Sequence, residues 1–335
     1  ALVRPQITCG THALAVALSA NLLPGDELLS PNGAPYDTLE EVIGIRESKC
    51  SLKEYGVSYR QVDLLPDGTF DFEGIRKAIN EKTKLVTIQR SKGYATRPSF
   101  SVAQIGEVIA FCKQCKPDVI CMVDNCYGEF TELTEPVNVG ADMMVGSLIK
   151  NPGGGLAPTG GYICGTAECV ERCAYRLSAP GLGQEVGANL GLLPSMYQGF
   201  FLAPNVVSGA LKGAIFAANL YERLGFRVVP NGSESRHDII QAVELGSAEG
   251  MLAFCRGIQA ASPVDSYAAP EPSPEPGYTD EVIMASGSFT QGSTIELSCD
   301  GPLREPYTCY LQGGLNFAAS RAGVLLAVQN AYFKD

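Results

Sequence analysis

Lys150 and Asp124 are the residues whose types and positions point most clearly to chemistry. Lys150 follows the apolar run 143–149 and precedes the glycine-rich segment 151–155, and Asp124 ends the apolar run 119–124. A lysine at the end of a buried strand loses solvation, which lowers its pKa and makes the amine a better nucleophile. An aspartate at a neighbouring strand end suits a pyridoxal-phosphate site. The lysine would form the Schiff base and the aspartate would keep the pyridinium nitrogen protonated.

The elements that must position these two residues alternate along the first half of the chain. Apolar, strand-like runs alternate with helical patterns, which predicts a mainly parallel sheet covered by helices on both faces. Ligands of such sheets bind beyond the carboxyl ends of the strands, where Asp124 and Lys150 are expected. The predicted strands are 2–8, 26–30, 57–63, 85–90, 119–124, 143–149 and 161–165, and the helices include 12–22, 38–44, 72–79, 102–112 and 167–178.

A phosphate site is predicted where the first strand passes into the first helix. Gly10, Thr11 and His12 stand at that helix start. Backbone N–H groups at a helix N-terminus bind anions well, and a small residue lets the phosphate approach. Ser147, three residues before Lys150, adds a hydroxyl that can reach the same phosphate. The alternative for Gly10 and Thr11 is an ordinary helix cap.

Four further side chains are candidates, each with a plainer alternative. The phenol of Tyr127, three residues after Asp124, can hydrogen-bond the ring oxygen of the cofactor, or it is a half-buried core residue. Tyr36 can stack on the pyridine ring, or it covers the core. His12 can face the ring, or it is a satisfied histidine in the first helical turn. Arg304 can hold a substrate carboxylate through its forked guanidinium, or it lies in a surface loop.

The second half of the chain follows a different pattern. A long apolar helix, 206–224, follows a segment rich in glycine and proline. Behind it we expect a smaller α+β domain, so the chain divides into a large domain, 1–205, and a connecting helix with a small domain, 206–335. The predicted elements of that part are strands 226–229, 239–243, 281–286 and 294–299, with helices near 247–261 and 314–331.

Composition excludes several classes of function. The chain has 335 residues and a net charge of −11 without a basic cluster, which argues against nucleic-acid binding and against an anionic membrane surface. The sequence contains no uncharged apolar run of about 18 residues, so we expect no membrane-spanning segment. Several of the 12 cysteines lie in apolar runs, which favours a reducing compartment. Cys112 and Cys115 form a C-x-x-C pair without a second pair or a nearby histidine, so no metal site is predicted.

The N-terminus suggests a truncated chain. The sequence opens without a methionine on residues 1–8, which resemble a strand inside a domain and lack the layout of a signal peptide. We expect a cytoplasmic protein, with a plastid as the alternative because a transit peptide would precede this start.

Long blocks of the sequence resemble one family throughout. Residues 8–13 (TCGTHA), 35–41, 123–130 (VDNCYGEF), 146–155 (GSLIKNPGGG) and 307–314 (YTCYLQGG) are similar to the methionine gamma-lyase-like, or aluminium-resistance, proteins. The resemblance implies the type I fold of pyridoxal-phosphate-dependent transferases and a homodimer or homotetramer. It also implies that Lys150 is the Schiff-base lysine and Asp124 the ring-nitrogen partner. By the same resemblance Gly10, Thr11 and Ser147 hold the phosphate, and Tyr36 or His12 packs on the ring.

The function expected from these features is elimination at a carbon–sulfur bond of a small amino-acid substrate. Lys150 would hold the cofactor and then act as the general base, and Asp124 would make the ring an electron sink. The alternatives are an aminotransferase or decarboxylase on the same fold, and a non-catalytic relative. A nucleotide-binding oxidoreductase is disfavoured, because the glycines at 181, 183 and 187 have the wrong spacing and follow a helix.

Overall fold

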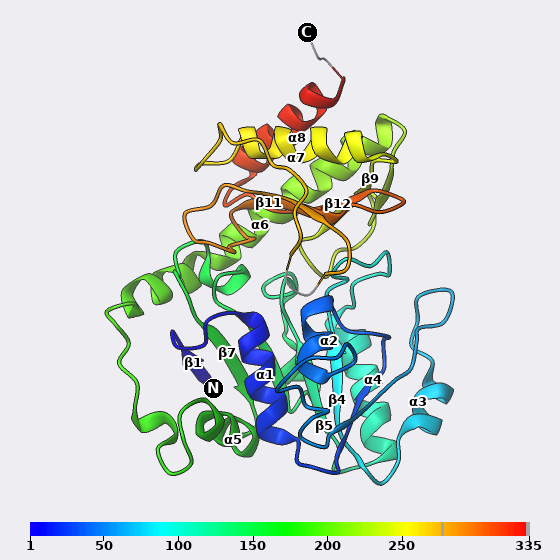
Figure 1. Ribbon diagram of the computed structural model, residues 1–335, viewed down its shortest axis with the longest axis vertical. Coiled ribbons are helices and arrows are strands. Elements are labelled where there is room, and N and C mark those ends of the chain that lie inside the picture. The colour runs from blue at the N-terminus through cyan, green and yellow to red at the C-terminus, as the bar shows by residue number, and fades with distance from the viewer. Residues whose placement is uncertain (276–277, 333–335) are drawn as a thin grey trace. The chain divides into compact units, whose positions relative to one another are not determined.

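The computed structural model describes residues 1–275 and 278–332 (Figure 1). The chain forms two compact units. Unit 1 comprises residues 1–93, 99–148 and 159–193, and unit 2 comprises residues 94–98, 149–158 and the chain from 194 onward. The boundary predicted at residue 205 falls inside a long helix, and the last three residues of the predicted second domain lie outside the described residues.

Unit 1 is built on a seven-stranded sheet with the order β1-β7-β6-β5-β4-β2-β3. The strands β2 to β6 pair in parallel, whereas β7 runs antiparallel to its neighbours β6 and β1. The mainly parallel sheet is therefore confirmed, with one reversed strand that the sequence pattern did not reveal. The strands are β1 (Leu2–Arg4), β2 (Glu27–Ser30), β3 (Ser58–Gln61), β4 (Thr83–Gln89), β5 (Ile120–Asp124), β6 (Met143–Ser147) and β7 (Gly161–Gly165).

Helices cover both faces of this sheet. Helices α1, α2 and α5 supply one apolar cluster, and α3 and α4 supply the other. The adjacent residues Leu28 and Leu29 belong to different clusters, because successive side chains of a strand point to opposite faces. The helices are α1 (Gly10–Asn21), α2 (Asp37–Ile43), α3 (Phe72–Ala78), α4 (Val102–Cys115) and α5 (Ala167–Leu177), with short 3-10 turns η1 (Pro136–Val139) and η3 (Gly183–Glu185).

Local side chains fix where these helices begin. The Ser101 hydroxyl accepts a hydrogen bond from the Gln104 backbone N–H at 3.1 Å, and the Gln104 side chain accepts one from the Ser101 backbone N–H at 2.9 Å. This reciprocal pair starts α4. The Cys9 sulfur caps α1 by accepting the His12 backbone N–H. The observed strand covers only Leu2–Arg4 of the predicted range 2–8, because the chain then turns toward this cap.

Unit 2 holds a five-stranded antiparallel sheet with the order β10-β11-β12-β9-β8. Residues from α6, α7, α8 and the sheet form one apolar core, which includes Tyr221, Phe254, Ile283 and Val324. The strands are β8 (Arg227–Val229), β9 (Gln241–Glu244), β10 (Val282–Ser286), β11 (Leu297–Pro302) and β12 (Thr308–Gly313), and the helices are α6 (Leu193–Arg223), α7 (Ala248–Ala260), α8 (Phe317–Tyr332) and the 3-10 turn η2 (Asn151–Gly153).

Two predictions for this half were wrong in detail. The strand β12 was not expected, although its burial is complete along all six residues. Helix α6 begins at Leu193 rather than at residue 206, and it continues through Pro204. A proline removes one helical hydrogen bond, which ordinarily marks a helix end. Here the helix continues, with buried residues such as Ala203 and Val206 on both sides of Pro204.

Helix α6 is the one described helix that is long and apolar enough to cross a membrane by length and composition. That is weak evidence, since buried core helices pass the same test, and 44% of its most apolar window is buried inside the protein. The expectation that the chain lacks a membrane span stays a prediction.

Candidate functional site

Three predicted site segments of unit 1 converge at the carboxyl edge of the parallel sheet. Asp124 ends β5 and Ser147 ends the adjacent parallel strand β6, and both are buried. Gly10, the first residue of α1, lies against Ser147 and against Cys126, two residues after Asp124. A Cβ atom at Gly10 would stand 3.3 Å from the Cys126 sulfur and 3.4 Å from the Ser147 Cβ. The N-terminus of α1 therefore packs beside the ends of β5 and β6. The phosphate site itself stays a prediction.

The first turn of α1 offers the donors that a phosphate needs. Backbone N–H groups in a first helical turn have no partner within the helix, and the helix dipole favours an anion there. The Thr11 hydroxyl lies 2.8 Å from the Tyr36 phenol oxygen, so these two predicted residues are joined by a hydrogen bond. The Gln89 side chain accepts the Tyr36 backbone N–H at 2.9 Å and holds Tyr36 at the start of α2.

The Asp124 carboxylate is held by the loop that follows it. The Cys126 backbone N–H donates to Asp124 Oδ1 at 3.1 Å, and only 5% of Asp124 is exposed. The next residue, Tyr127, is half-buried and has a φ of 72°. That left-handed conformation is costly for a residue with a Cβ atom, and it persists only where the surroundings impose it. The site thus contains a strained turn directly after its carboxylate.

His12 is tied to the segment before its own helix. The Thr8 backbone N–H donates to His12 Nδ1 at 3.1 Å. In the neutral ring this acceptor role places the proton on Nε2. The alternative of a satisfied histidine in the first helical turn thereby gains support. A role for His12 at the face of the cofactor ring stays a prediction.

Lys150 belongs to unit 2 and follows Ser147 by three residues. It is partly buried and stands immediately before η2, where its backbone oxygen accepts the Gly153 N–H at 3.2 Å. Its positive charge acts on Asp300, a buried residue of β11. Burial raises the pKa of Asp300 to about 7, while a hydrogen bond from Tyr94 and the Lys150 charge oppose that rise.

Arg304 makes an ion pair in the structure. Its Nη1 donates to Asp280 Oδ2 at 2.8 Å, and 52% of the Arg304 side chain is exposed. This arrangement matches the plainer alternative of a surface loop arginine. Binding of a substrate carboxylate by Arg304 stays a prediction.

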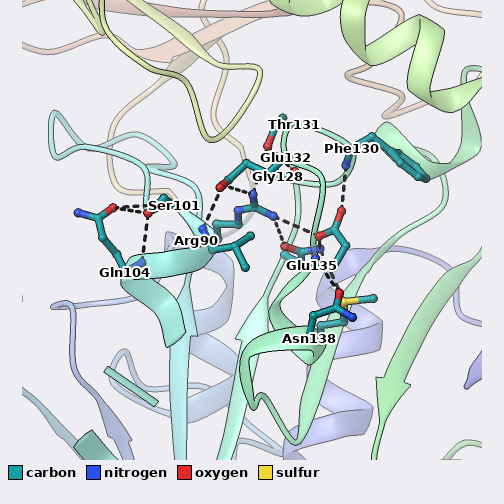
Figure 2. A network of polar contacts seen from close by, with 12 residues as sticks. Arg90, Ser101, Gln104, Gly128, Phe130, Thr131, Glu132, Glu135 and Asn138 are labelled. Atoms are coloured by element: carbon teal, nitrogen blue, oxygen red, sulfur yellow. Dashed lines mark hydrogen bonds and ion pairs between the residues drawn. The ribbon is translucent and has the colours of Figure 1, made fainter. Parts of the chain in front are cut away.

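Among the buried charged residues that were not singled out from the sequence, two interact with predicted site residues. Burial raises the pKa of Asp300, and the charge of Lys150 opposes that rise. Arg90 lies fully buried directly after β4 (Figure 2). The sequence signal for each is a charge in or at the end of a mainly apolar run: Asp300 within 295–303, and Arg90 at the end of 85–90. Within the described ranges 1–275 and 278–332, no group of three or more His, Cys, Asp or Glu side chains could hold a metal ion.

Comparison with known proteins finds a match to a family model described as methionine gamma-lyase, over residues 1–332. The uncharacterized protein YnbB of Bacillus subtilis (strain 168) is 54% identical over 336 residues, which cover 100% of this chain and 80% of that protein. The crystal structure of a carbon-sulfur lyase involved in aluminum resistance from Clostridium novyi NT is 50% identical, with a TM-score of 0.93. That match covers 98% of this chain and 77% of the other. The resemblance drawn from the sequence is confirmed.

A more distant structure tests the fold. The pyridoxal-5'-phosphate dependent protein YhfS from Escherichia coli is 17% identical, with a TM-score of 0.63, and the match covers 100% of this chain and 81% of the other. At that identity the likeness concerns the fold alone. The type I fold of pyridoxal-phosphate-dependent enzymes, expected from the sequence, is confirmed.

Proposed function

Because the chain belongs to the methionine gamma-lyase family, we propose that it is a pyridoxal-phosphate-dependent lyase. It would cleave a carbon–sulfur bond of a sulfur-containing amino acid by elimination. The observation that carries this proposal is the convergence of Gly10, Asp124 and Ser147 at one edge of the sheet in unit 1. Fold and family are pyridoxal-phosphate-dependent, and this edge offers the donors and the carboxylate that such a cofactor requires.

The residues present fit the cofactor. A Cβ atom at Gly10 would be crowded by Cys126 and Ser147, so glycine lets the first turn of α1, with its N–H groups, pack beside Ser147. These groups would hold the phosphate. The Asp124 carboxylate would pair with the ring nitrogen. Three residues of chain span at most roughly 11 Å, so the sequence itself keeps the Lys150 amine within reach of the end of β6.

When bound, pyridoxal phosphate supplies an electron sink for the charge left on the substrate Cα after proton removal. Lys150 would anchor the cofactor covalently and would be released when the substrate amine replaces it. The freed Lys150 amine would take the α proton and then donate a proton to the departing group. The Cys126 N–H would keep the Asp124 carboxylate oriented toward the ring nitrogen. The overall reaction would consume one water molecule and give a thiol, ammonia and an oxo acid.

The test begins with an absorbance spectrum of the protein supplied with pyridoxal phosphate, followed by borohydride reduction and mapping of the modified lysine. Lys150→Ala should lose the yellow absorbance, the adduct and the release of thiol from sulfur amino acids. Lys92→Met provides the matched control, because Lys92 is another buried lysine, close after the carboxyl end of β4. An adduct that survives Lys150→Ala but disappears in Lys92→Met would refute the assignment. A transamination product in place of ammonia would favour an aminotransferase.

We also propose that two or four copies assemble, that the substrate is a small amino acid, and that neither nucleic acid nor membrane is a partner. The first turns of α6 support the assembly, since 73% of Tyr197 and 81% of Phe201 are exposed there. A second copy of the chain is the occupant we expect on these aromatic side chains. The twelve free cysteines suit the proposed cytoplasmic location. Sedimentation of Phe201→Glu beside the unmodified protein tests the assembly, and equal molar masses would argue against it.

A further inference from the structure

Arg90 lies at the centre of a polar network in unit 1 (Figure 2). Its side chain has 0% exposure, directly after β4. Its Nη1 donates to Asn125 Oδ1 at 2.8 Å and to Glu135 Oε2 at 3.2 Å. Its Nη2 donates to Glu132 Oε1 at 2.8 Å and to Thr131 Oγ1 at 3.2 Å. All four partners belong to the loop that begins immediately after Asp124.

The positive charge of Arg90 is compensated by direct pairing with carboxylates. A guanidinium removed from water is tolerated only where ion pairs and hydrogen bonds replace its solvation. Glu132 and Glu135 provide two carboxylates, which are 25% and 23% exposed. Burying an arginine for core packing alone is unfavourable, since an apolar residue of similar size would fill the space at lower cost. We therefore infer that the network serves to fix the conformation of the loop that contacts Arg90.

The same network fixes the strained part of that loop. Tyr127 and Phe130 both have a positive φ, 72° and 62°. The Glu135 carboxylate accepts the Phe130 backbone N–H at 3.0 Å through Oε1 and the Asn125 side-chain N–H at 2.9 Å through Oε2. Gly128 passes so close to the guanidinium that a Cβ atom there would stand 2.5 Å from Arg90 Cδ. The loop backbone thus lies directly on the arginine.

The backbone of Arg90 is joined to the candidate catalytic strand as well. Its N–H donates to the Asp124 backbone oxygen at 3.0 Å. Asp124 is therefore held by Arg90 on two sides, through its own carbonyl and through the side chain of its neighbour Asn125. Glu132 also accepts the Val102 backbone N–H at 3.0 Å, which ties the loop to the first residue of α4.

We propose that Arg90 is a positioning residue that sets the geometry of Asp124 and Tyr127 by clamping residues 125–135 against the end of β4. The assignment rests on the function proposed above, in which Asp124 controls protonation of the cofactor ring. In this role Arg90 would act through its protein partners rather than by touching cofactor or substrate. Its effect reaches the reaction through the orientation of the Asp124 carboxylate and through the strained turn at Tyr127.

The test compares the complete protein loaded with pyridoxal phosphate in five forms: unmodified, Arg90→Met, Arg90→Lys, Gly128→Ala and Arg60→Met. Arg90→Met should keep the borohydride-reducible adduct on Lys150 while kcat falls by about 10- to 100-fold and KM changes little. The absorbance maximum of the bound cofactor and its pH profile should shift as well, since Asp124 moves relative to the ring nitrogen. Arg90→Lys should recover part of the activity, because an ammonium supplies the charge without the fork.

Two controls separate positioning from general loss of stability. Arg60→Met removes a half-exposed arginine of the same unit, paired with Glu27, and should leave spectrum and kcat unchanged. Gly128→Ala keeps every charge but adds a methyl group against Arg90, so it should reproduce the spectral shift. If Arg90→Met does not fold, Gly128→Ala and Arg90→Lys decide the question. Variants that fold with the unmodified spectrum, pH profile and kcat overturn the role of Arg90. An unmodified protein without an adduct on Lys150 instead overturns the proposed function.

Discussion

Replacing Asp300 by asparagine should remove a pH-dependent destabilisation of the folded protein. Asp300 is 7% exposed on β11, and burial raises its pKa from an ordinary value of 3.8 to about 7. The folded protein thus holds this proton more tightly than the unfolded chain does. Ionisation of Asp300 therefore opposes folding. The destabilisation begins as the pH rises above about 4, grows up to about pH 7 and is constant at higher pH.

The size of the effect follows from the difference between the two pKa values. About three pH units, at 1.36 kcal/mol for each, correspond to about 4 kcal/mol of unfolding free energy above pH 7. Asparagine resembles the protonated acid in shape and stays neutral at every pH. Between pH 4.5 and pH 8, the stability of Asp300→Asn relative to the unmodified protein should therefore rise by about 3 kcal/mol. Taking this difference cancels any effect of the substitution that does not depend on pH.

Urea unfolding at pH 4.5 and pH 8, without added cofactor, measures this quantity. Far-UV circular dichroism is the appropriate signal, since the chain contains no tryptophan. Glu271→Gln provides a matched control in the same unit, because it removes a carboxylate whose side chain is 77% exposed. The control should leave the pH dependence unchanged. The reasoning is refuted if Asp300→Asn has the same relative stability at both pH values.

Two further outcomes concern the proposed cofactor contacts. Asp124→Asn should keep the cofactor bound but slow exchange of the substrate α-hydrogen with deuterated water. Loss of a charged hydrogen bond, worth about 1.5–3 kcal/mol, corresponds to an exchange rate about 10- to 150-fold lower. A near-normal exchange rate would exclude Asp124 from this role. Ser147→Ala and Thr11→Val should each weaken cofactor binding by a similar free energy, with a smaller effect on turnover. Cofactor titration measures this, and unchanged affinity in both variants would place the phosphate elsewhere.

The elements that carry the candidate site were predictable from the sequence because they follow simple periodic patterns. The apolar runs 119–124 and 143–149 indicate buried strands, and a parallel sheet brings their carboxyl ends to the same edge. The second strand ends at Ser147, two residues earlier than predicted. The small residue at the start of α1 predicted the approach of a phosphate, and this stays a prediction, although Gly10 does pack closely against Cys126 and Ser147. Strand direction is not encoded in such patterns, so the reversal of β7 could not be anticipated.

What the sequence did not reveal depends on contacts between distant residues. Arg90 is followed by polar residues and has no periodic partner, and its burial results from carboxylates more than 40 positions away. Asp300 stands in an apolar run, and its effect arises from the packing of β11 rather than from any motif. Helix α6 was placed too late, because Pro204 and the neighbouring glycines suggest a loop unless the packing of the apolar face is known.

The division of the chain has a consequence for how the protein is made. The polypeptide passes from one unit to the other five times, after residues 93, 98, 148, 158 and 193. Neither unit is therefore a continuous stretch that emerges complete from the ribosome. When residue 193 has been synthesised, the segment carrying Lys150 still lacks the rest of unit 2, whereas Asp124 and Ser147 already have their own unit around them. We therefore expect the segment that carries Lys150 to become ordered only after the rest of unit 2 has been synthesised. A fragment ending at residue 193 should form the sheet of unit 1 but leave Lys150 without its ordered surroundings.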